Sequence, residues 1–444
     1  MNSIQVTPMI YLETYGCQMN EYDSELVRAI LSNAGYVFTD DDLSADIIML
    51  NTCSVRDTAQ RKVYGYLHEL RYRRKGKPAR FGILGCMATS LRRELLEDKA
   101  LGLDFVVGPD SYKRLPEILK GVAAGQGQGY DVTLSDFETY ADVDPMRAGG
   151  VNAWVAVMRG CNNFCSFCVV PYARGRERCR PVDNILEEMK RLADRGFKQV
   201  TLLGQNVNSY VHDGQGFAEL LTAVAKVDGI QRIRFTSPHP KDFPDKLIRV
   251  IAKNPKVCKH VHLPLQAGND RILKLMNRNY TRNDYIALVD RIRKAVPQVV
   301  LTTDLITGFP TETDAEFEDT VSLMKDVEFD AAFIFKYSPR PNTKAAAELR
   351  DDIPETKKTQ RIVRLNKIQA DISLKKNQAY VGRTEEVLIE AAGKYNSDAA
   401  FGRNDGNKIV ALFGNDLNPG ELVSAKIIRA TPHQLKGKIT EKQG

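Results

Sequence analysis

Short apolar runs alternate with amphipathic helical patterns along the first part of this 444-residue chain, and this alternation restricts its fold more than any other feature. Strand–helix repetition builds a parallel sheet with helices on both faces. The expected strands are Ile10–Glu13, Ile47–Leu50, Phe81–Leu84 and Phe105–Val107, and the expected helices are Ser24–Ala34, Thr58–Leu70 and Ser90–Leu96. A parallel α/β domain is therefore expected over residues 8–124.

A change of composition separates this domain from the next one. Residues 121–130 are rich in Gly and Gln, and residues 131–150 are polar without a helical or strand period. Such stretches form connections rather than regular elements. A linker or wrapping segment is expected at residues 125–146.

The alternation resumes at Ala153 and continues through six strand–helix units. The expected strands are Ala153–Met158, Gln199–Leu203, Arg232–Phe235, His260–Leu263, Val299–Leu305 and Ala332–Phe335. Amphipathic helices such as Asp183–Arg195 lie between them, and a polar helix at Arg361–Gln378 follows the last unit. Six units with strands buried on both sides predict a partial (β/α)6 barrel over residues 147–377, related to the eight-unit barrel.

The pattern changes again after Ala379. Short strands at 386–390, 408–412 and 422–428 are punctuated by Asn-Asp-Gly at 404–406 and Asn-Pro-Gly at 418–420. A segment of this size and pattern is typical of a small β-barrel. We expect such a barrel over residues 378–441.

Composition excludes several classes of protein. With 43% apolar and 27% charged residues, the chain is typical of a folded globular protein rather than a disordered one. It contains no run of 18 apolar residues, and its first residues lack the basic and apolar regions of a secretion signal. We therefore expect a cytoplasmic protein without a membrane partner. Its net charge of +7 is compatible with nucleic-acid binding but does not require it.

Eight cysteines in a chain of this kind point to metal ligands or catalytic groups rather than to disulfides. Cys161, Cys165 and Cys168 form a C-x3-C-x2-C loop directly after the expected strand at Ala153–Met158. Three thiolates on one loop can hold three irons of a [4Fe–4S] cluster and leave the fourth iron open. An open iron can chelate the amine and carboxylate of S-adenosylmethionine (SAM).

A structural zinc ion with Cys179 as the fourth ligand is the alternative for this loop. Zinc sites usually pair two C-x2-C units, and this loop contains only one. The spacing therefore favours the cluster.

A second set of cysteines is spread along the N-terminal domain. Cys17, Cys53 and Cys86 each follow an expected strand, and their separations are each close to the length of one βαβ unit. The carboxyl ends of parallel strands gather at one edge of a sheet, where open α/β folds bind ligands. We therefore expect a second cluster with one open iron, the alternative being three unrelated buried thiols.

A series of short motifs resembles one enzyme family in order and over nearly the whole chain. The motifs are Glu13–Asn20 (ETYGCQMN), Asn51–Arg56 (NTCSVR), Cys168–Tyr172 (CVVPY), Leu203–Asn208 (LGQNVN), Ser237–Pro240 (SPHP), His262–Asn269 (HLPLQAGN) and Thr303–Pro310 (TDLITGFP). They are similar to those of the radical-SAM methylthiotransferases, and most similar to the subgroup of that family that modifies isopentenyladenosine in tRNA.

The resemblance implies an auxiliary [4Fe–4S] cluster on Cys17, Cys53 and Cys86, and a SAM cluster on Cys161, Cys165 and Cys168. It also implies that residues 378–441 form an RNA-binding TRAM domain. The implied SAM-contacting residues are Phe167, Leu203, Gly204, Gln205, Asn206, Thr307, Gly308 and Phe309. No side chain is expected to act as an acid–base catalyst.

The implied activity is methylthiolation of C2 of N6-isopentenyladenosine at position 37 of tRNA, with two molecules of SAM and the auxiliary cluster. The implied partners are the tRNA anticodon loop and an electron donor such as a flavodoxin or ferredoxin, and the sulfur donor is left open. The alternatives are modification of a ribosomal-protein aspartate or of another tRNA adenosine, and a non-catalytic iron–sulfur sensor that binds RNA. A sensor would not need the two SAM-contacting turns.

Two groups of cations are candidates for contacts with RNA phosphates. They are Arg174, Arg176, Arg178 and Arg180 after the core cysteines, and Arg71, Arg73 and Arg74 in a basic run of the N-terminal domain. The alternatives are a solvated or SAM-pairing face for the first group and an ordinary exposed helix end for the second. Cys179 stands where the family pattern has Ser, and residues 394–403 match the TRAM pattern only loosely.

Overall fold

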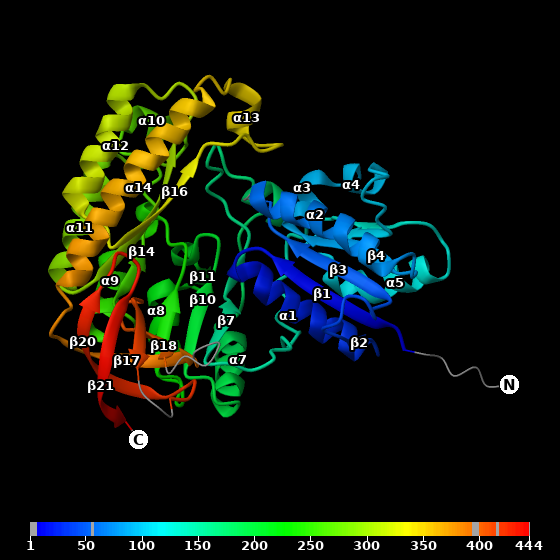
Figure 1. The fold of residues 1–444 in the computed structure, drawn as a ribbon, viewed down its shortest axis with the longest axis horizontal. Helices are drawn as coiled ribbons and strands as arrows, with labels where there is room; N and C mark the ends of the chain where they lie inside the picture. The colour runs from blue at the N-terminus through cyan, green and yellow to red at the C-terminus, as the bar shows by residue number, and fades with distance from the viewer. Residues whose placement is uncertain (1–6, 55–56, 393–398, 414–416, 444) are drawn as a thin grey trace. The chain divides into compact units, whose positions relative to one another are not determined.

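The computed structural model describes residues 7–54, 57–392, 399–413 and 417–443 (Figure 1). The chain divides into two compact units. Unit 1 comprises residues 1–148, 158–180 and 340–347, and unit 2 comprises residues 149–157, 181–339 and 348–444. In the described parts of the chain, no helix is long and apolar enough to cross a membrane.

Unit 1 is built on a six-stranded parallel sheet in the order β2-β1-β3-β4-β5-β6. Its strands are β1 (Met9–Tyr15), β2 (Val37–Phe38), β3 (Ile47–Thr52), β4 (Arg80–Gly85), β5 (Phe105–Val107) and β6 (Gly129–Asp131). Its helices are α1 (Gln18–Asn33), α2 (Asp57–Arg74), α3 (Cys86–Leu91), α4 (Glu94–Glu97), η1 (Tyr112–Arg114) and α5 (Leu115–Ala123). The predicted parallel α/β domain is confirmed.

The packing of this sheet explains why its strands read as continuous apolar runs. Every residue of β3 is buried. Ile48 and Leu50 belong to the same core cluster as Val63 and Leu67 of α2, and α1 packs on β1 and β3 as well. A strand covered by helices on both faces has no solvent side, so it shows no alternation of apolar and polar residues.

Besides β2 and α5, which were not expected from the sequence, two details of unit 1 differ from the sequence-based expectation. The helix expected at residues 90–96 begins earlier, at Cys86, and is interrupted at Arg92, whose φ of 53° ends α3. Part of the expected linker forms β6, which pairs with β5 at the edge of the sheet. Such short elements contain too few residues for a periodic pattern to be visible in the sequence.

Unit 1 also contains a loop that the sequence assigns to the central domain. β8 (Met158–Arg159) and β9 (Arg178–Cys179) pair antiparallel and close a loop that includes α6 (Val170–Arg174). Ala345 belongs to α13 (Lys344–Glu348), and its backbone N–H donates to the carbonyl of Ser166 in this loop at 2.7 Å. The domain boundaries read from the sequence stay a prediction, whereas compactness groups this loop with unit 1.

Unit 2 contains six parallel strands in two three-stranded sheets, β7-β10-β13 and β14-β15-β16. A parallel bridge joins Ile233 of β13 to Val257, which lies three residues before β14. The strands are β7 (Asn152–Ala156), β10 (Gln199–Leu203), β13 (Arg232–Phe235), β14 (His260–His262), β15 (Val300–Thr307) and β16 (Ala331–Lys336). The predicted six-unit partial barrel is confirmed.

Helices connect these strands and pack on the sheets (Figure 1). They are α7 (Val182–Asp194), α8 (Phe217–Val224), α9 (Asp245–Lys253), α10 (Asp270–Leu275), α11 (Arg282–Ala295), α12 (Asp314–Val327) and α14 (Glu355–Gln378). The loops after β10 and β13 contain η2 (Val207–Ser209), β11 (Val211–His212), β12 (Gln215–Gly216) and η3 (Pro240–Asp242). α14 packs on both β15 and β16, so the polar helix expected after the barrel is an integral part of it.

The C-terminal part of unit 2 is a closed five-stranded barrel in the order β17-β18-β19-β21-β20. Its strands are β17 (Thr384–Ala391), β18 (Ala399–Asn404), β19 (Ile409–Phe413), β20 (Leu422–Ala430) and β21 (Leu435–Gln443). The predicted small β-barrel is confirmed, although the sequence indicated only three of these strands. Residues 394–398 of the loosely matching TRAM stretch lie outside the described residues.

Buried arginines attach this barrel to the amino ends of the central strands. Arg232, the first residue of β13, donates to the carbonyl of Arg403 at 2.6 Å. Arg234 donates to the carbonyls of Asn404 and Asp405 at 2.8 and 3.0 Å. The small barrel therefore lies at the amino edge of the sheets, opposite the edge where the turns after β10 and β15 begin.

Candidate functional site

The three N-terminal cysteines lie at the carboxyl ends of three neighbouring strands of unit 1. Cys17 follows β1, Cys53 follows β3 and Cys86 follows β4. The Cys53 backbone N–H donates to the carbonyl of Tyr15 at 3.0 Å, and the side chains of Cys17 and Cys53 share a hydrogen bond. The sheet thus brings these cysteines to one edge, where parallel α/β folds bind ligands.

Two asparagines fix the loops that carry these cysteines. Asn20 Nδ2 donates to Asn51 Oδ1 at 3.1 Å, and Asn51 Nδ2 donates to the Asn20 carbonyl at 3.0 Å. Gly85, the residue before Cys86, has a φ of 86°, and a Cβ there would lie 2.3 Å from Asn51 Oδ1. Sequence reasoning quoted both asparagines only as parts of motifs and missed this positioning role.

The surroundings of Cys17 favour its thiolate form. A hydrogen bond with the Cys53 side chain and the positive charge of Arg174 lower the pKa of the Cys17 thiol to about 6, against the opposing effect of burial. Burial raises the pKa of Cys86, and the charge of Arg174 opposes that rise. Because metal ligation requires thiolates, a buried guanidinium beside these thiols favours ligation.

Three thiols on separate loops fit a [4Fe–4S] cluster better than a single metal ion. Within the described residues, no three His, Cys, Asp or Glu side chains are grouped so as to hold one metal ion. A cubic cluster binds each thiolate at a different iron, so its cysteines stand farther apart than the ligands of a single ion. Three cysteines at three loop ends, beside the buried Arg174, supply one thiolate for each of three irons of such a cluster.

The core cysteines lie on the loop between β8 and α6, also in unit 1. Cys161 and Cys165 are buried, and Cys168 is partly exposed. The Asn163 backbone N–H is directed at Cys161 Sγ at 3.5 Å, and the Cys168 N–H donates to the Cys165 carbonyl at 2.9 Å. A backbone N–H turned toward the Cys161 sulfur suits a thiolate there, because that donor stabilises the charged form.

Gly160 allows the loop to pass close to its own return segment. Its φ is 76°, and a Cβ at this position would lie 2.0 Å from the carbonyl oxygen of Arg176. This close approach lets the Cys161 N–H donate to the carbonyl of Gly175 at 3.1 Å. Only glycine fits here, because the backbone is left-handed and another chain segment fills the side-chain space.

Cys179, the fourth ligand of the alternative zinc site, is partly exposed and lies in β9. Cys179 pairs with Met158 in the β8–β9 ladder, and the described residues contain no group of three ligands for a single ion there or elsewhere. Phe167 lies in the same loop and is half-buried. Its contact with SAM stays a prediction.

The two predicted SAM-contacting turns lie in unit 2. Leu203 ends β10 and is followed by Gly204, Gln205 and Asn206, while Thr307 ends β15 and is followed by Gly308 and Phe309. Three buried oxygens of these turns have no hydrogen-bond partner among the described residues, namely Gln205 Oε1, Asn206 Oδ1 and Thr307 Oγ1. Buried acceptors without partners are costly, so they indicate a ligand that donates hydrogen bonds. The ammonium group of SAM has this chemistry.

A buried ion pair supports the second of these turns. Glu312 Oε2 accepts from the Gly308 backbone N–H at 2.7 Å and from Arg361 Nη1 of α14 at 2.6 Å. Burial raises the pKa of Glu312 to about 7, against the opposing effects of the Gly308 N–H and Arg361. A Cβ on Gly308 would lie 2.4 Å from Lys358 Cγ, so α14 closes over the turn. Sequence reasoning missed Glu312, Lys358 and Arg361, because none of them lies in a motif with an evident ligand type.

The SPHP motif supports the first turn. Asn208 Nδ2 donates to the His239 carbonyl at 2.9 Å, and the His239 backbone N–H donates to Asn208 Oδ1 at 2.7 Å. Asn206 Nδ2 donates to Asp242 Oδ2 at 2.8 Å. Burial, and then the charges of Arg278 and Lys241, lower the pKa of His239 to about 2, so this imidazole is neutral.

The arginines after the core cysteines are mostly not available to RNA. Arg174, Arg178 and Arg180 are buried, and Arg178 Nη1 and Nη2 bond Asp110 at 2.8 and 3.1 Å. Only Arg176 of the four is exposed. As phosphate-contact candidates, Arg174, Arg178 and Arg180 are therefore corrected to internal partners of unit 1, because their guanidinium groups are enclosed by the protein.

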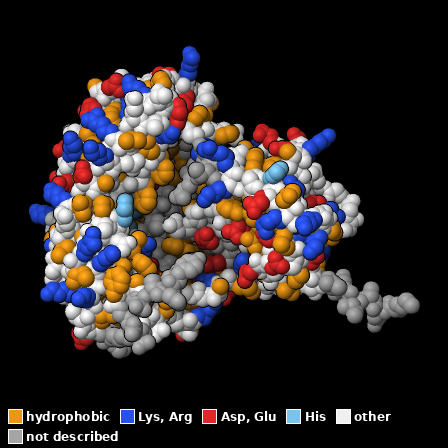
Figure 2. Space-filling view, in the orientation of Figure 1, with side chains coloured by type: hydrophobic (Ala, Val, Ile, Leu, Met, Phe, Trp, Pro, Cys, Tyr) orange, Lys and Arg blue, Asp and Glu red, His pale blue; other side chains and the backbone are white. Residues whose placement is uncertain are grey.

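The basic run of the N-terminal domain is also engaged internally. Arg74 is buried and bonds the carbonyls of Asp42, Ala45 and Pro78. Arg73 pairs with Asp42 at 2.5 Å, and Arg71 bonds carbonyls of residues 100–102. Lys75 and Lys77 are the exposed cations of this run. Figure 2 shows Lys and Arg side chains interspersed with Asp and Glu on the visible face of each unit rather than gathered into one basic stripe.

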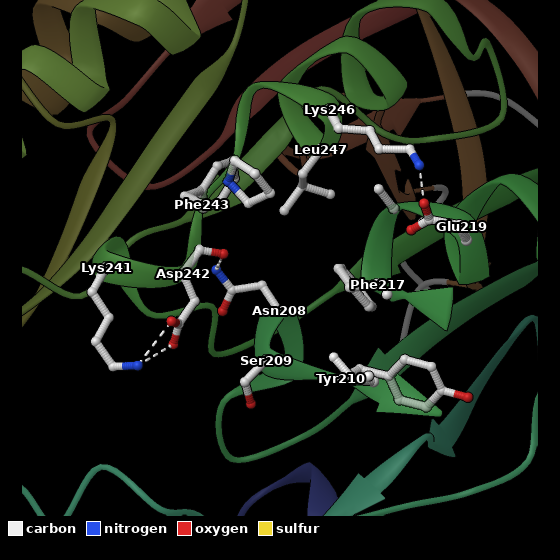
Figure 3. Close-up of a pocket in the computed structure, with 14 residues that line it drawn as sticks. Asn208, Ser209, Tyr210, Phe217, Glu219, Lys241, Asp242, Phe243, Lys246 and Leu247 are labelled. Carbon is white, nitrogen blue, oxygen red and sulfur yellow. Dashed lines mark hydrogen bonds and ion pairs between the residues drawn. The ribbon is translucent and has the colours of Figure 1, made fainter. Parts of the chain in front are cut away.

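A pocket of about 550 Å³ lies beside the first SAM-contacting turn in unit 2 (Figure 3). Asn208, Tyr210 and Phe217 line one side of it, and Phe243 and Leu247 line the other. Its two lysines are paired within the wall, Lys241 with Asp242 and Lys246 with Glu219. The pocket therefore offers neither of these cations to an anionic ligand.

Three family models match successive parts of the chain. They are the uncharacterised protein family UPF0004 at residues 9–108, the radical SAM superfamily at residues 155–324 and the TRAM domain at residues 378–440. Among solved structures, the chain is similar to the radical S-adenosylmethionine methyltransferase TsrM from Kitasatospora setae, which contains cobalamin and a [4Fe–4S] cluster. The TM-score is 0.61 at 16% identity over 77% of this chain and 78% of that chain, which shows a shared fold.

Curated relatives are similar over almost their whole length. The tRNA-2-methylthio-N(6)-dimethylallyladenosine synthase of Chloroherpeton thalassium is 45% identical over 431 residues, covering 96% of this chain and 95% of the relative. The synthase of the same name from Porphyromonas gingivalis strain W83 is 46% identical over 442 residues, covering 97% and 95%. The chain therefore belongs to the tRNA-2-methylthio-N(6)-dimethylallyladenosine synthase family of radical-SAM methylthiotransferases.

Proposed function

We propose that this chain is a radical-SAM enzyme that methylthiolates C2 of N6-isopentenyladenosine at position 37 of tRNA, using two molecules of SAM. One observation carries the proposal, namely two three-cysteine sites in a chain that matches synthases of this name from end to end. The ligands of the auxiliary cluster are Cys17, Cys53 and Cys86, and the ligands of the SAM cluster are Cys161, Cys165 and Cys168.

The reaction requires radical chemistry rather than acid–base chemistry. A C–H bond on an aromatic base has no useful acidity, so no arrangement of carboxylates or imidazoles can activate it. When bound, the clusters and SAM supply the one-electron and sulfur chemistry of the reaction. The chain's own part is to bind, orient and exclude water.

The side chains of unit 2 are suited to binding and orienting SAM. The free acceptors of Gln205, Asn206 and Thr307 would receive the ammonium group of SAM, and Phe309 packs on Tyr337 with ring centroids 5.1 Å apart. The Glu312–Arg361 pair would hold the second turn in the geometry that SAM requires. None of these groups needs to transfer a proton, in keeping with the absence of an expected acid–base catalyst.

The proposed RNA partner is the anticodon loop of a tRNA, which the TRAM domain would help to bind. Recognition of a single base in a loop requires that the base leave its stack, and phosphate contacts around it offset that cost. An electron donor such as a flavodoxin or ferredoxin is proposed because reductive cleavage of SAM consumes an electron. A cytoplasmic location follows from the tRNA substrate.

Nucleoside mass spectrometry tests the proposal in cells. A strain that lacks this protein should contain isopentenyladenosine without the 2-methylthio group, and the wild-type chain should restore it. The Cys161→Ala, Cys165→Ala, Cys168→Ala variant should not. Restoration by that variant would exclude radical-SAM catalysis, whereas loss of a modified ribosomal-protein aspartate with unchanged tRNA would select the alternative substrate.

A second assay separates the tRNA substrates. Purified enzyme with reductant and SAM should modify tRNA that carries the isopentenyl group and should leave unmodified tRNA unchanged. Equal product from both tRNAs would show that the enzyme recognises another adenosine and would leave the radical-SAM assignment in place.

A further inference from the structure

Arg174 connects the two cysteine sites of unit 1. It is the last residue of α6, six positions after Cys168, and its side chain is only 2% exposed. Its Nε donates to Cys86 Sγ at 3.0 Å, and its Nη2 donates to Asp23 Oδ2 at 2.7 Å. A residue of the core-cluster loop therefore contacts a ligand residue of the auxiliary site directly.

Asp23 anchors both ends of the core-cluster loop. Its Oδ2 accepts from Arg174, which follows the three core cysteines, and its Oδ1 accepts from Arg159 Nη2, which precedes them, at 2.8 Å. Asp23 lies on α1, the helix that begins directly after Cys17. One carboxylate thus ties the element that follows Cys17 to the two arginines that bracket Cys161, Cys165 and Cys168.

The charges in this network leave one positive charge without a carboxylate. Arg159, Arg174 and Arg178 are all buried, and the carboxylates paired with them are those of Asp23 and Asp110. The Nη1 atom of Arg174 is also buried and has no hydrogen-bond partner among the residues that the structure describes. A buried cation in excess is stabilised by a nearby anion, and Arg174 already contacts Cys86 Sγ, which carries a negative charge when it ligates a cluster.

We propose that Arg174 is a positioning residue that orients Cys86 as a ligand of the auxiliary cluster and compensates the negative charge of that cluster. The inference rests on the proposed function for the identity of the cluster. Hydrogen bonds and positive charge at a ligand sulfur stabilise the reduced, more negative state of an iron–sulfur cluster. Because Arg174 belongs to the core loop, that loop sets the properties of the auxiliary site.

The test uses full-length protein that carries only the auxiliary cluster. The parent is the Cys161→Ala, Cys165→Ala, Cys168→Ala variant, into which Arg174→Gln, Arg174→Lys and Arg176→Gln are introduced separately. Arg176 is the matched control, because it lies in the same loop but is exposed. The measurements are iron content, circular dichroism and the midpoint potential of the cluster from a redox titration followed by electron paramagnetic resonance.

We expect Arg174→Gln to shift the midpoint potential to a more negative value, Arg174→Lys to give a smaller shift because it keeps the charge, and Arg176→Gln to give none. Loss of iron in folded Arg174→Gln protein, with iron retained in Arg174→Lys, also supports the proposal. An unchanged potential with full iron content in Arg174→Gln overturns it. Loss of native circular dichroism in both Arg174 variants overturns it as well, because the residue would then be needed for folding alone.

The parent variant separates this inference from the proposed function. If the parent contains no iron before any change at Arg174, the auxiliary cluster itself is refuted. If the parent contains a cluster, the comparison at Arg174 is valid whatever the RNA substrate of the enzyme is.

Discussion

At the scale of single residues, the chemistry of a side chain was easier to read from the sequence than its exposure. The motif spacing identified six cysteines, and the structure places them in two groups in one unit. The same reading treated Arg174 and Arg74 as surface cations, whereas both are buried and bonded within unit 1. Arginine serves equally well as an external phosphate ligand and as an internal donor to carbonyls, so the residue type alone does not decide.

Removing Arg74 should therefore affect folding before it affects RNA. In Arg74→Ala, the carbonyls of Asp42, Ala45 and Pro78 lose a common donor, at a cost on the order of 3 kcal/mol in the free energy of unfolding. Chemical denaturation measures that loss. Unchanged stability together with weaker tRNA binding would return Arg74 to the RNA interface.

Lys75 and Lys77 provide the matched test of RNA binding by the same helix end. Both are exposed, so Lys75→Ala with Lys77→Ala should leave stability nearly unchanged. If both contact phosphate, the slope of tRNA affinity against salt concentration should fall by about 2 in the double variant. An unchanged salt slope would exclude this run from the RNA interface.

His239 gives a prediction for the dependence of stability on pH. Burial and the charges of Arg278 and Lys241 lower its pKa to about 2, so the folded state keeps it neutral, whereas the unfolded state protonates it near its ordinary value of 6.5. Stability is therefore lost as the pH falls below about 6.5, by about 1.4 kcal/mol per pH unit from this residue. His239→Asn should remove that part of the slope in denaturation curves recorded between pH 7.5 and pH 5, and an unchanged slope would contradict the assignment.

At the scale of elements, periodicity predicted the long strands and helices but not the short ones. Four of the six strands in the unit 1 sheet and all six strands in the two unit 2 sheets were predicted, because each combines an apolar run with a following helical pattern, whereas the short strands β2 and β6 were missed. β18 and β21 were missed because neither contains a clear apolar run. The sequence of β21 is rich in Lys and Glu, and the apolar residues that begin β18 are followed by Gly402 and Arg403. The division between the units was missed too, because compactness depends on contacts such as Ala345 with Ser166 that no local pattern encodes.

β16 carries two exposed aromatic residues beside β15, the strand that leads to the second predicted SAM-contacting turn. Phe333 and Phe335 are 56% and 41% exposed, and in the strand register they stand opposite Asp304 and Ile306 of β15, the strand that ends at Thr307. A flat base with an apolar substituent suits such a face, because aromatic stacking contributes about 1–3 kcal/mol per base. Phe333→Ala should therefore raise KM for isopentenylated tRNA about tenfold or more while reductive SAM cleavage continues.

The control for this prediction lies on the other side of the barrel. Val211 is also exposed but belongs to the β11–β12 hairpin, which follows β10 of the other three-stranded sheet. Val211→Ala should leave KM for tRNA unchanged. Equal effects of the two substitutions would mean that β16 has no special relation to the base.

At the scale of the whole molecule, the TRAM barrel and the two predicted SAM-contacting turns lie at opposite edges of the parallel sheets of unit 2. The TRAM barrel is bonded to the amino ends of β13 through Arg232 and Arg234, whereas the SAM-contacting turns lie at the carboxyl ends of β10 and β15. A ligand that reaches both edges must be long, as a folded tRNA is. This arrangement suits an enzyme that binds RNA with its TRAM barrel and acts on a single base at its parallel sheets.

Two clusters with separate ligand sets should be separable by mutation. Reconstituted wild-type protein should contain about eight irons per chain, and each triple cysteine-to-alanine variant should contain about four. The variant that lacks Cys17, Cys53 and Cys86 should still cleave SAM reductively, because the core loop and both SAM-contacting turns are intact, but it should form no methylthio product, because the site for sulfur is lost. Iron analysis, 5′-deoxyadenosine formation and nucleoside mass spectrometry measure the three quantities.

The two clusters are nevertheless expected to influence each other, because Arg174 of the core loop bonds Cys86 of the auxiliary site. Removing either cluster should therefore shift the spectrum of the other. Normal methylthio product from the variant without the auxiliary cysteines would refute the two-site mechanism.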